Sequence, residues 1–214
     1  KSFAISYYKN NERELAVVPM LHINRPEFYK ITKSKIDSLR NNGYKVFYES
    51  IESNINDSIQ LDIIMRKFRR ITGFALLDYM DTKNEEFKFL QNQKFVSQNE
   101  VDYGVDYDID YRADLNLEDL IYHYENKYGD IILNDCDYST QFGKKYRCSN
   151  VESNNVYYIL NTLRDSHVLN EIKQSDFKKI VLVYGRIHIM DLHSKFINIG
   201  WQHQKHKTDR ITNF

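Results

Sequence analysis

The chain has 214 residues, 42% apolar and 28% charged, which is typical of one globular domain and too hydrophobic for a disordered protein. Thirty basic residues balance thirty acidic ones, so the formal net charge is zero and provides no support for a nucleic-acid partner. No apolar run approaches the roughly 20 residues that a membrane-spanning helix needs. Composition therefore excludes disordered and membrane-spanning classes and leaves the chemistry open.

The chain begins at Lys1 rather than Met, which indicates an upstream piece that was processed or omitted. A signal peptide or lipid anchor could have been lost there, so localisation stays unknown and export or membrane anchoring stays open. Cys136 and Cys148 lie 12 positions apart in a polar segment. They could form a disulfide in an exported protein or remain free thiols in the cytosol.

The N-terminal part predicts a hairpin followed by a βαβ unit. Ser2–Tyr8 and Leu15–Leu21 are apolar segments joined by a polar turn, and Pro19 should loosen the ladder near the end of the second strand. Pro26 begins a helix that should run to about Arg40, and Tyr44–Tyr48 forms the next strand. Strands connected in this way should be parallel.

The middle of the chain predicts two helices and a weak strand region. Apolar residues at helical spacing favour a helix over Asp57–Tyr79 and another over Leu115–Lys127, with Asn116 as its cap. The basic cluster at 66–70 is expected on a solvated face, although one arginine could instead point at an anionic group. Between the helices, residues 87–111 predict short strands.

The aspartate-rich stretch from Val101 to Asp114 could be mistaken for a calcium loop. It lacks the glycine placement and the closing glutamate of an EF-hand. Aspartate alternating with Val, Tyr and Ile favours a half-exposed strand instead.

The C-terminal part predicts helices on either side of the most hydrophobic strand. Residues 134–154 form a polar excursion, followed by a helix over Val156–Gln174, a strand over Ile180–Tyr184 and a closing helix over Met190–Ile199. We therefore expect a three-layer α/β/α fold with a mostly parallel central sheet and an N-terminal hairpin. Residues 1–214 should form a single domain, with an insertion or lid within 87–154.

Three polar residues follow predicted strands. His22 and Glu49 follow the two strands of the βαβ unit, and His188 follows the strand that ends near Gly185. In an open, mostly parallel sheet, ligands bind beyond the carboxyl ends of the strands. Gly185 would let the backbone turn sharply and bring the imidazole of His188 inward. We expect the three side chains to form one polar site.

Two imidazoles and a carboxylate allow two kinds of chemistry. They could bind a divalent metal such as Zn, Mn or Co with an open position for water. Alternatively, a histidine could act as general base on water while Glu49 orients it, without a metal. The sequence has no HExxH, GxSxG, P-loop or GxGxxG motif, which argues against an elbow-type serine hydrolase and a dinucleotide enzyme.

The order of these motifs resembles that of the TraB/PrgY/GumN proteins, which include the Tiki proteases. The resemblance is carried by Pro19–His22, Glu49, Arg164, Gly185–His188 and the aspartate-containing segment Tyr111–Leu120. The family has two G-x-x-H motifs with a glutamate and an arginine between them. The first motif here has Pro19 where the family has glycine.

The resemblance implies a hydrolase of a peptide or ester bond with a peptide or small-molecule substrate. His22, Glu49 and His188 would form the site, and Arg164 would stabilise developing negative charge. Arg164 could instead be an ordinary arginine on a helix surface. Related folds include erythromycin esterase, a metal-free hydrolase, and the haem-binding ChaN proteins, so a haem-binding or regulatory protein remains an alternative. Oligomeric state is unknown.

Three further histidines are expected to face solvent. They are His193, His203 and His206, of which the last two lie in the basic C-terminal segment. Trp201 is expected to pack this segment onto the core.

Overall fold

The computed structural model describes residues 2–76, 93–98, 103–207 and 209–212. The chain divides into two compact units. The first contains Lys1–Ser50, Leu90–Ala113 and Val168–Phe214, and the second contains Ile51–Phe89 and Asp114–His167. The expectation of a single domain with an insertion or lid at 87–154 stays a prediction, and the second unit has different bounds from that segment.

The first unit is built on a sheet in which the described residues form six strands, in the order β7-β5-β8-β3-β2-β9. The four strands β7, β5, β8 and β3 are parallel, and β2 is antiparallel to both β3 and β9. The strand bounds are β2 Ser6–Asn10, β3 Arg13–Met20, β5 Lys45–Tyr48, β7 Tyr111–Arg112, β8 Lys179–Gly185 and β9 Gln202–His203. The prediction of a mostly parallel sheet with an N-terminal hairpin is confirmed.

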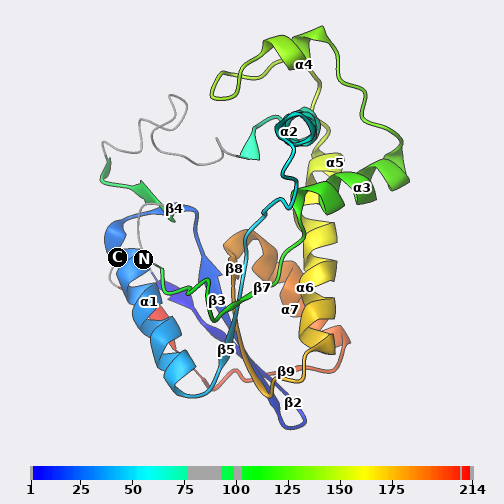
Figure 1. Ribbon diagram of the computed structural model, residues 1–214. Coiled ribbons are helices and arrows are strands. Elements are labelled where there is room, and N and C mark those ends of the chain that lie inside the picture. The colour runs from blue at the N-terminus through cyan, green and yellow to red at the C-terminus, as the bar shows by residue number, and fades with distance from the viewer. Residues whose placement is uncertain (1, 77–92, 99–102, 208, 213–214) are drawn as a thin grey trace. The chain divides into compact units, whose positions relative to one another are not determined.

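Helices cover both faces of this sheet, because its strands are apolar on both sides. Val181 and Val183 of β8 pack with α1 (Pro26–Asn41), while the intervening Leu182 packs with α7 (Ile189–Asn198) on the opposite face. The C-terminal part of α6 (Leu163–Gln174) adds to the second face through Val168 and Ile172. Figure 1 shows α1 and α7 on opposite sides of the strands. These three layers confirm the α/β/α prediction.

The predicted βαβ unit is present, with one addition that the local pattern did not reveal. Its strands β3 and β5 are parallel, as expected, but β8 lies between them and pairs with both. The connecting helix α1 begins at Pro26, as predicted, and ends at Asn41. A strand from the C-terminal part of the chain is thus the centre of the N-terminal unit.

Pro19 lies where β3 has lost one of its two neighbours. Pairing of β3 with β2 ends at Val17, whereas pairing with β8 continues to Met20. A proline without an N–H is tolerated where the ladder on one side has already ended.

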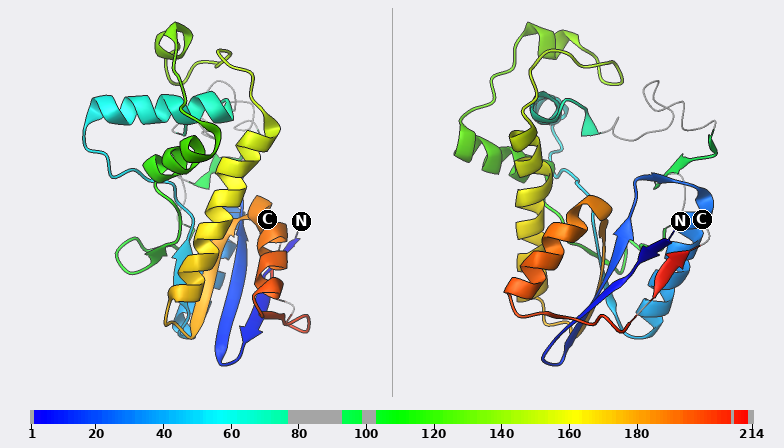
Figure 2. Two further views of the ribbon diagram at one scale, coloured as in Figure 1. Left: turned by 90° about the vertical axis from the view of Figure 1, so that its right-hand side faces the viewer. Right: turned by 180° about the vertical axis from the view of Figure 1, so that it is seen from behind.

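The first unit also contains two separate two-stranded sheets. β1 (Ser2–Ala4) pairs with β10 (Arg210–Thr212), so the first and last described strands lie side by side. Figure 2 shows this pair close to both chain ends. β4 (Ile23–Asn24) pairs with β6 (Val96–Ser97).

The second unit is helical and has its own apolar core. Its main helices are α2 (Ser58–Thr72) and α3 (Leu117–Tyr128), whose buried residues include Phe68 and Leu120. Shorter helices follow, and their bounds are α4 Asp135–Ser139, α5 Ser153–Tyr157 and a π-helical segment Tyr158–Thr162. The predicted helix over Val156–Gln174 therefore consists of three consecutive segments that end with α6, which begins in this unit.

Two predicted elements differ from the structure. The helix expected to reach Tyr79 ends at Thr72, because Gly73 adopts a left-handed conformation with φ of 83° and caps it; positions 77–79 lie outside the described residues. The strand expected over the aspartate-rich stretch is confined to Tyr111–Arg112, and positions 101 and 102 of that stretch also lie outside the described residues. Tyr107–Ile109 of the stretch form a turn, beside which the backbone N–H of Asp106 donates a hydrogen bond to the carboxylate of Asp110 at 2.8 Å.

The arginines of α2 bind the polar excursion and do not form a solvated face. The side chain of Arg69 is only 1% exposed and donates to the carbonyl oxygens of Asp137 at 2.8 Å and Thr140 at 2.9 Å. Arg70 forms an ion pair with the buried carboxylate of Asp137 at 2.5 Å. The expectation of a solvated cluster is wrong. These guanidinium groups donate hydrogen bonds to oxygens of α4 and its loop, including backbone carbonyls that have no partner within the helix.

A disulfide closes the same excursion. Cys136 in α4 is bonded to Cys148, which resolves the alternative that the sequence left open. In the described part of the chain no helix is long and apolar enough to cross a membrane.

Replacing both cysteines with serine should lower the free energy of unfolding by about 3 kcal/mol, because the bond closes a loop of 12 positions in the unfolded chain. Chemical denaturation of wild type and the double variant measures this difference. Ser139→Ala, an exposed substitution in the same helix, is the control, and equal midpoints for all three proteins would contradict the prediction.

Candidate functional site

The carboxyl ends of β3, β8 and β5 lie together at one edge of the sheet. Met20 of β3 is in register with Gly185 of β8, and Tyr48 of β5 is in register with Val183. The residues that follow these strands therefore begin their paths from one edge, where parallel sheets bind ligands.

Glu49 and His188 form the polar pair at this edge. One carboxylate oxygen of Glu49, Oε1, lies 3.6 Å from Nε2 of His188. The other, Oε2, accepts a hydrogen bond from the backbone N–H of Gly185. The side chain of Glu49 is 9% exposed and that of His188 is 2% exposed, so the pair is shielded from solvent. Electrostatic interactions are stronger in such a shielded environment than in water. The structure thus brings together two of the three residues expected to form the site.

Gly185 leaves room for the carboxylate of Glu49 to approach its backbone closely. A Cβ atom on Gly185 would lie 2.8 Å from Oε2 of Glu49, a distance that real Cβ atoms essentially never show. Its φ of −52° is available to any residue, so the sharp turn expected from the sequence is not the reason for glycine. The missing side chain lets Glu49 reach the N–H group.

His188 is positioned by a short 3₁₀ turn, Arg186–His188, between β8 and α7. Its ring packs edge-on against Tyr184, with the centroids 4.9 Å apart. A turn directly after a buried strand therefore returns the imidazole to the edge of the sheet.

His22 lies two residues beyond β3 and is half-buried. Its backbone carbonyl accepts a hydrogen bond from the N–H of Gln98 at 2.9 Å. Over the described ranges, no three His, Cys, Asp or Glu side chains form a group that could bind a metal ion. The residues expected as metal ligands, His22, Glu49 and His188, therefore do not form a three-ligand group there.

A pocket of about 390 Å³ adjoins the two chain segments that carry these histidines. Leu21 and Ile23, on either side of His22, line it together with Arg186, two residues before His188. The guanidinium of Arg186 lies 4.7 Å from the ring centroid of Phe3 and, within the described residues, forms no ion pair. An apolar pocket with one such cation suits a ligand that has an apolar part and a negative group.

Tyr103 is a residue near Glu49 that sequence reasoning missed. Burial raises the pKa of its phenol, and Tyr107, Tyr48 and the carboxylate of Glu49 raise it further. Its hydroxyl lies 3.3 Å from that of Tyr107, in a segment anchored by Arg40, which donates to the carbonyl oxygen of Gly104 at 2.7 Å. The aspartate-tyrosine pattern of the sequence did not reveal that Tyr103 lies near Glu49, because only tertiary contacts distinguish it from the other tyrosines of the segment.

Arg164 belongs to the second unit, where it forms a buried ion pair. Its Nε and Nη2 atoms donate to the two carboxylate oxygens of Asp114 at 2.9 and 2.6 Å. Arg164 is 6% exposed and Asp114 is 3% exposed. The alternative of an ordinary helix-surface arginine is wrong, whereas the stabilisation of negative charge in a reaction stays a prediction.

Two of the three histidines expected in solvent are half-buried. His193 accepts or donates a hydrogen bond with the hydroxyl of Tyr8 at 2.8 Å, and its ring centroid lies 5.2 Å from that of His203. Burial, together with His193 and Lys205, lowers the pKa of His203. His206 is exposed, as expected, and the burial of Trp201 at 4% exposure confirms its predicted packing.

Replacing Arg164 with methionine should lower the free energy of unfolding by about 3–5 kcal/mol, because it leaves the buried carboxylate of Asp114 without its bidentate partner. Urea denaturation followed by circular dichroism measures the loss. The control is Lys178→Met, whose ion pair with Glu12 is largely exposed and should contribute little. A similar small effect in both variants would contradict a structural role for the Asp114–Arg164 pair.

No family model, no curated protein and no solved structure matches this chain. The resemblance to the TraB/PrgY/GumN proteins therefore depends on the short sequence motifs alone and stays a prediction. The Glu49–His188 pair and the pocket beside His22 are the features of the structure that bear on function.

Proposed function

We propose that this protein is a hydrolase of the TraB/Tiki type that cleaves a peptide or ester bond with water activated by His188 and Glu49. The observation that carries this proposal is the shielded carboxylate–imidazole pair at the carboxyl ends of β5 and β8. Histidine is the commonest general base in enzymes, and a carboxylate beside it stabilises its protonated form.

In the proposed reaction, His188 removes a proton from water while the oxygen of that water attacks the carbonyl carbon. The resulting imidazolium is stabilised by Glu49, whose second oxygen is held by the N–H of Gly185. The same imidazolium then protonates the departing amine or alkoxide, which restores the neutral base. Nε2 of His188 and Oε1 of Glu49 are 3.6 Å apart. Catalytic hydrogen bonds are often this long without substrate and shorten when substrate binds.

A metal is not needed for these steps. The sequence left open a divalent ion, Zn, Mn or Co, bound by His22, Glu49 and His188, but the described side chains contain no group of three ligands to hold it. Stabilisation of the oxyanion is assigned to Arg164 only by the resemblance.

The pocket lined by Leu21, Ile23 and Arg186 supports a small or peptidic substrate with an apolar segment and a negative group. A guanidinium without an ion-pair partner gains a bidentate contact when a carboxylate binds. The same pocket favours the second candidate function, a non-catalytic protein that binds an anionic ligand such as haem through its carboxylates. Binding of the anionic ligand without any hydrolysis would favour this binding protein over the hydrolase.

Replacing His188 with asparagine or Glu49 with glutamine should lower kcat/KM by about 10²–10⁴-fold, because each removes a member of the pair that activates water. Hydrolysis of p-nitrophenyl hexanoate, followed by absorbance, and of a peptide mixture, followed by mass spectrometry, measures the change.

The matched control is His206→Gln, which removes an exposed imidazole and should leave turnover unchanged. Circular dichroism checks that each variant is folded. Unchanged turnover in both site variants would refute the assignment, whereas activity that a chelator abolishes and Zn²⁺ restores would replace the metal-free mechanism with the metal-dependent one.

Replacing Arg186 with methionine should raise KM for an anionic ester about tenfold or more, as expected for loss of a charge-assisted contact of roughly 1.5–3 kcal/mol. Mono-p-nitrophenyl adipate tests this, because it differs from the hexanoate ester mainly in its terminal carboxylate. The hexanoate should show little change in KM. Equal effects on the two esters would exclude Arg186 as the carboxylate receptor.

A further inference from the structure

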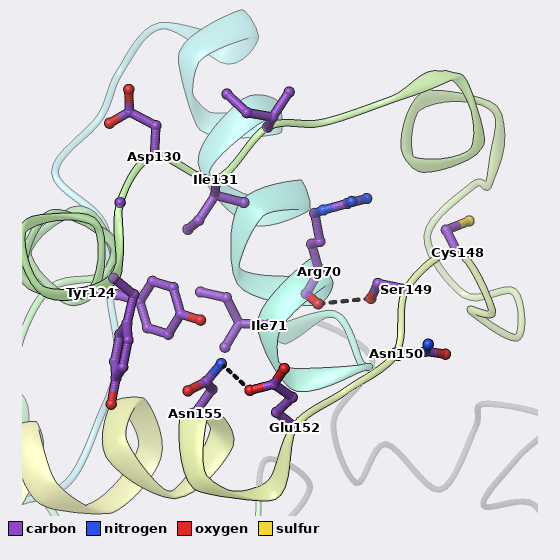
Figure 3. A pocket seen from close by; sticks show the side chains of 13 residues that line it. Arg70, Ile71, Tyr124, Asp130, Ile131, Cys148, Ser149, Asn150, Glu152 and Asn155 are labelled. Atoms are coloured by element: carbon purple, nitrogen blue, oxygen red, sulfur yellow. Dashed lines mark hydrogen bonds between the residues drawn. The ribbon is translucent and has the colours of Figure 1, made fainter.

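The second unit contains a pocket of about 530 Å³ whose polar side chains do not converge. Figure 3 shows Asp130 and Glu152 on different sides of it. Glu152 accepts a hydrogen bond from Asn155 at 3.1 Å, and the hydroxyl of Ser149 donates to the carbonyl oxygen of Arg70 at 2.9 Å. Ligand sites have a few polar groups that point at one place, and this lining does not provide them.

A cluster of three rings in the first unit has a different property, because two of the rings are imidazoles in contact. This histidine cluster consists of Tyr8 of β2, His193 of α7 and His203 of β9. The ring centroids of His193 and His203 are 5.2 Å apart, and they lie 5.7 and 5.2 Å from that of Tyr8. Both imidazoles are half-buried, and Nδ1 of His193 lies 2.8 Å from the hydroxyl of Tyr8. Histidine is the side chain that ordinarily changes its charge between about pH 5 and 8.

The surroundings of the histidine cluster disfavour positive charge. Burial lowers the pKa of His203, and the imidazole of His193 and the ammonium of Lys205 lower it further. From β2 the cluster meets the phenol of Tyr8, whose pKa is raised by burial to about 12, so this hydroxyl stays neutral. Among the described residues, no carboxylate is paired with either imidazole to offset an added proton. Folding therefore favours neutral rings, and the stability of this contact is present above the ordinary histidine pKa and is lost as the pH falls below it.

The strand that carries His203 is held by few backbone hydrogen bonds. β9 is the edge strand beside β2 and pairs with it at two positions, one of which joins His203 to Tyr8. The next residue, Gln204, donates its backbone N–H to the carbonyl oxygen of Tyr7 at 2.7 Å. Segments with few backbone hydrogen bonds open locally at a lower free energy than the core of a sheet.

Two anchors flank this strand. Before it, Trp201 is buried in the second face of the sheet. After it, Asp209 forms an ion pair with Lys35 at 2.5 Å, and its carbonyl oxygen accepts a hydrogen bond from the N–H of Ile5 at 3.0 Å. The segment between the anchors, residues 202–207, is named the strap. It can open while the chain on both sides of it stays packed.

We propose that the histidine cluster is a pH-dependent switch, in which protonation of His193 and His203 in mildly acidic solution releases the strap from β2. Two imidazolium rings in contact, with the ammonium of Lys205 nearby, repel one another. His203 then moves into solvent, and the pairing of β9 with β2 opens. Deprotonation restores the pairing. Release leaves backbone N–H and C=O groups of β2 unpaired at the edge of the sheet. The proposal does not depend on the hydrolase function.

The test is hydrogen exchange of the whole protein at about pH 7.5 and about pH 5, followed by mass spectrometry and corrected for the intrinsic exchange rate at each pH. Peptides that cover the strap should lose protection about tenfold or more at the lower pH, since a shift of one pKa unit corresponds to a factor of about ten. Peptides from β3 and β8 should keep their protection. Equal protection of the strap at both pH values would overturn the proposal.

Glutamine variants identify the groups that respond. His203→Gln and His193→Gln each remove one of the two charges, so the pH-dependent loss of protection should disappear in both. His206→Gln removes an exposed imidazole of the strap itself and should respond as wild type does. A pH response that persists in both cluster variants would contradict the switch.

An NMR titration of the imidazoles provides a measurement that does not depend on the stability of the variants. In wild type, His203 should titrate below the ordinary histidine pKa, and in His193→Gln its pKa should rise toward that value. A His203 that titrates at the ordinary value in wild type would also overturn the proposal.

Discussion

The pairing of β8 with both β3 and β5 is the constraint on which the first unit depends. It places a C-terminal strand at the centre of an N-terminal βαβ unit and aligns three carboxyl ends at one edge. The alternating burial of Val181, Leu182 and Val183 between α1 and α7 stabilises this arrangement, since the side chains of residues 180–184 are removed from water. Glu49 and His188 become neighbours because of this pairing and not because of any local motif.

A hydrogen bond then determines how the carboxylate of Glu49 is oriented. The N–H of Gly185 donates to Oε2, and the absence of a Cβ at residue 185 leaves room for this close approach. The same glycine precedes the turn that carries His188, so one backbone position controls the geometry of both members of the pair. The proposed chemistry depends on this local geometry, because a carboxylate that rotated freely would not hold the imidazolium in a defined orientation.

Arginine organises the second unit in a different way. Arg69 and Arg70 bind the carbonyl and carboxylate oxygens of Asp137, and Arg164 binds Asp114 in a bidentate pair. Buried guanidinium groups of this kind need several acceptors to offset their desolvation, which these backbone and carboxylate oxygens provide.

The sequence by itself determined the α/β/α class, the hairpin, the helix that begins at Pro26 and the positions of Glu49 and His188 after strands. These features follow from apolar periodicity and from the prolines and glycines that begin or end elements, which are local properties of the chain. It did not determine that Arg69 is buried, that helix α2 ends at Thr72 or that Gly185 serves close approach. Only the tertiary structure decided these points. The reason is physical: burial, ion pairing and the reach of one side chain to another backbone depend on residues distant in the chain, and no periodic pattern encodes such contacts.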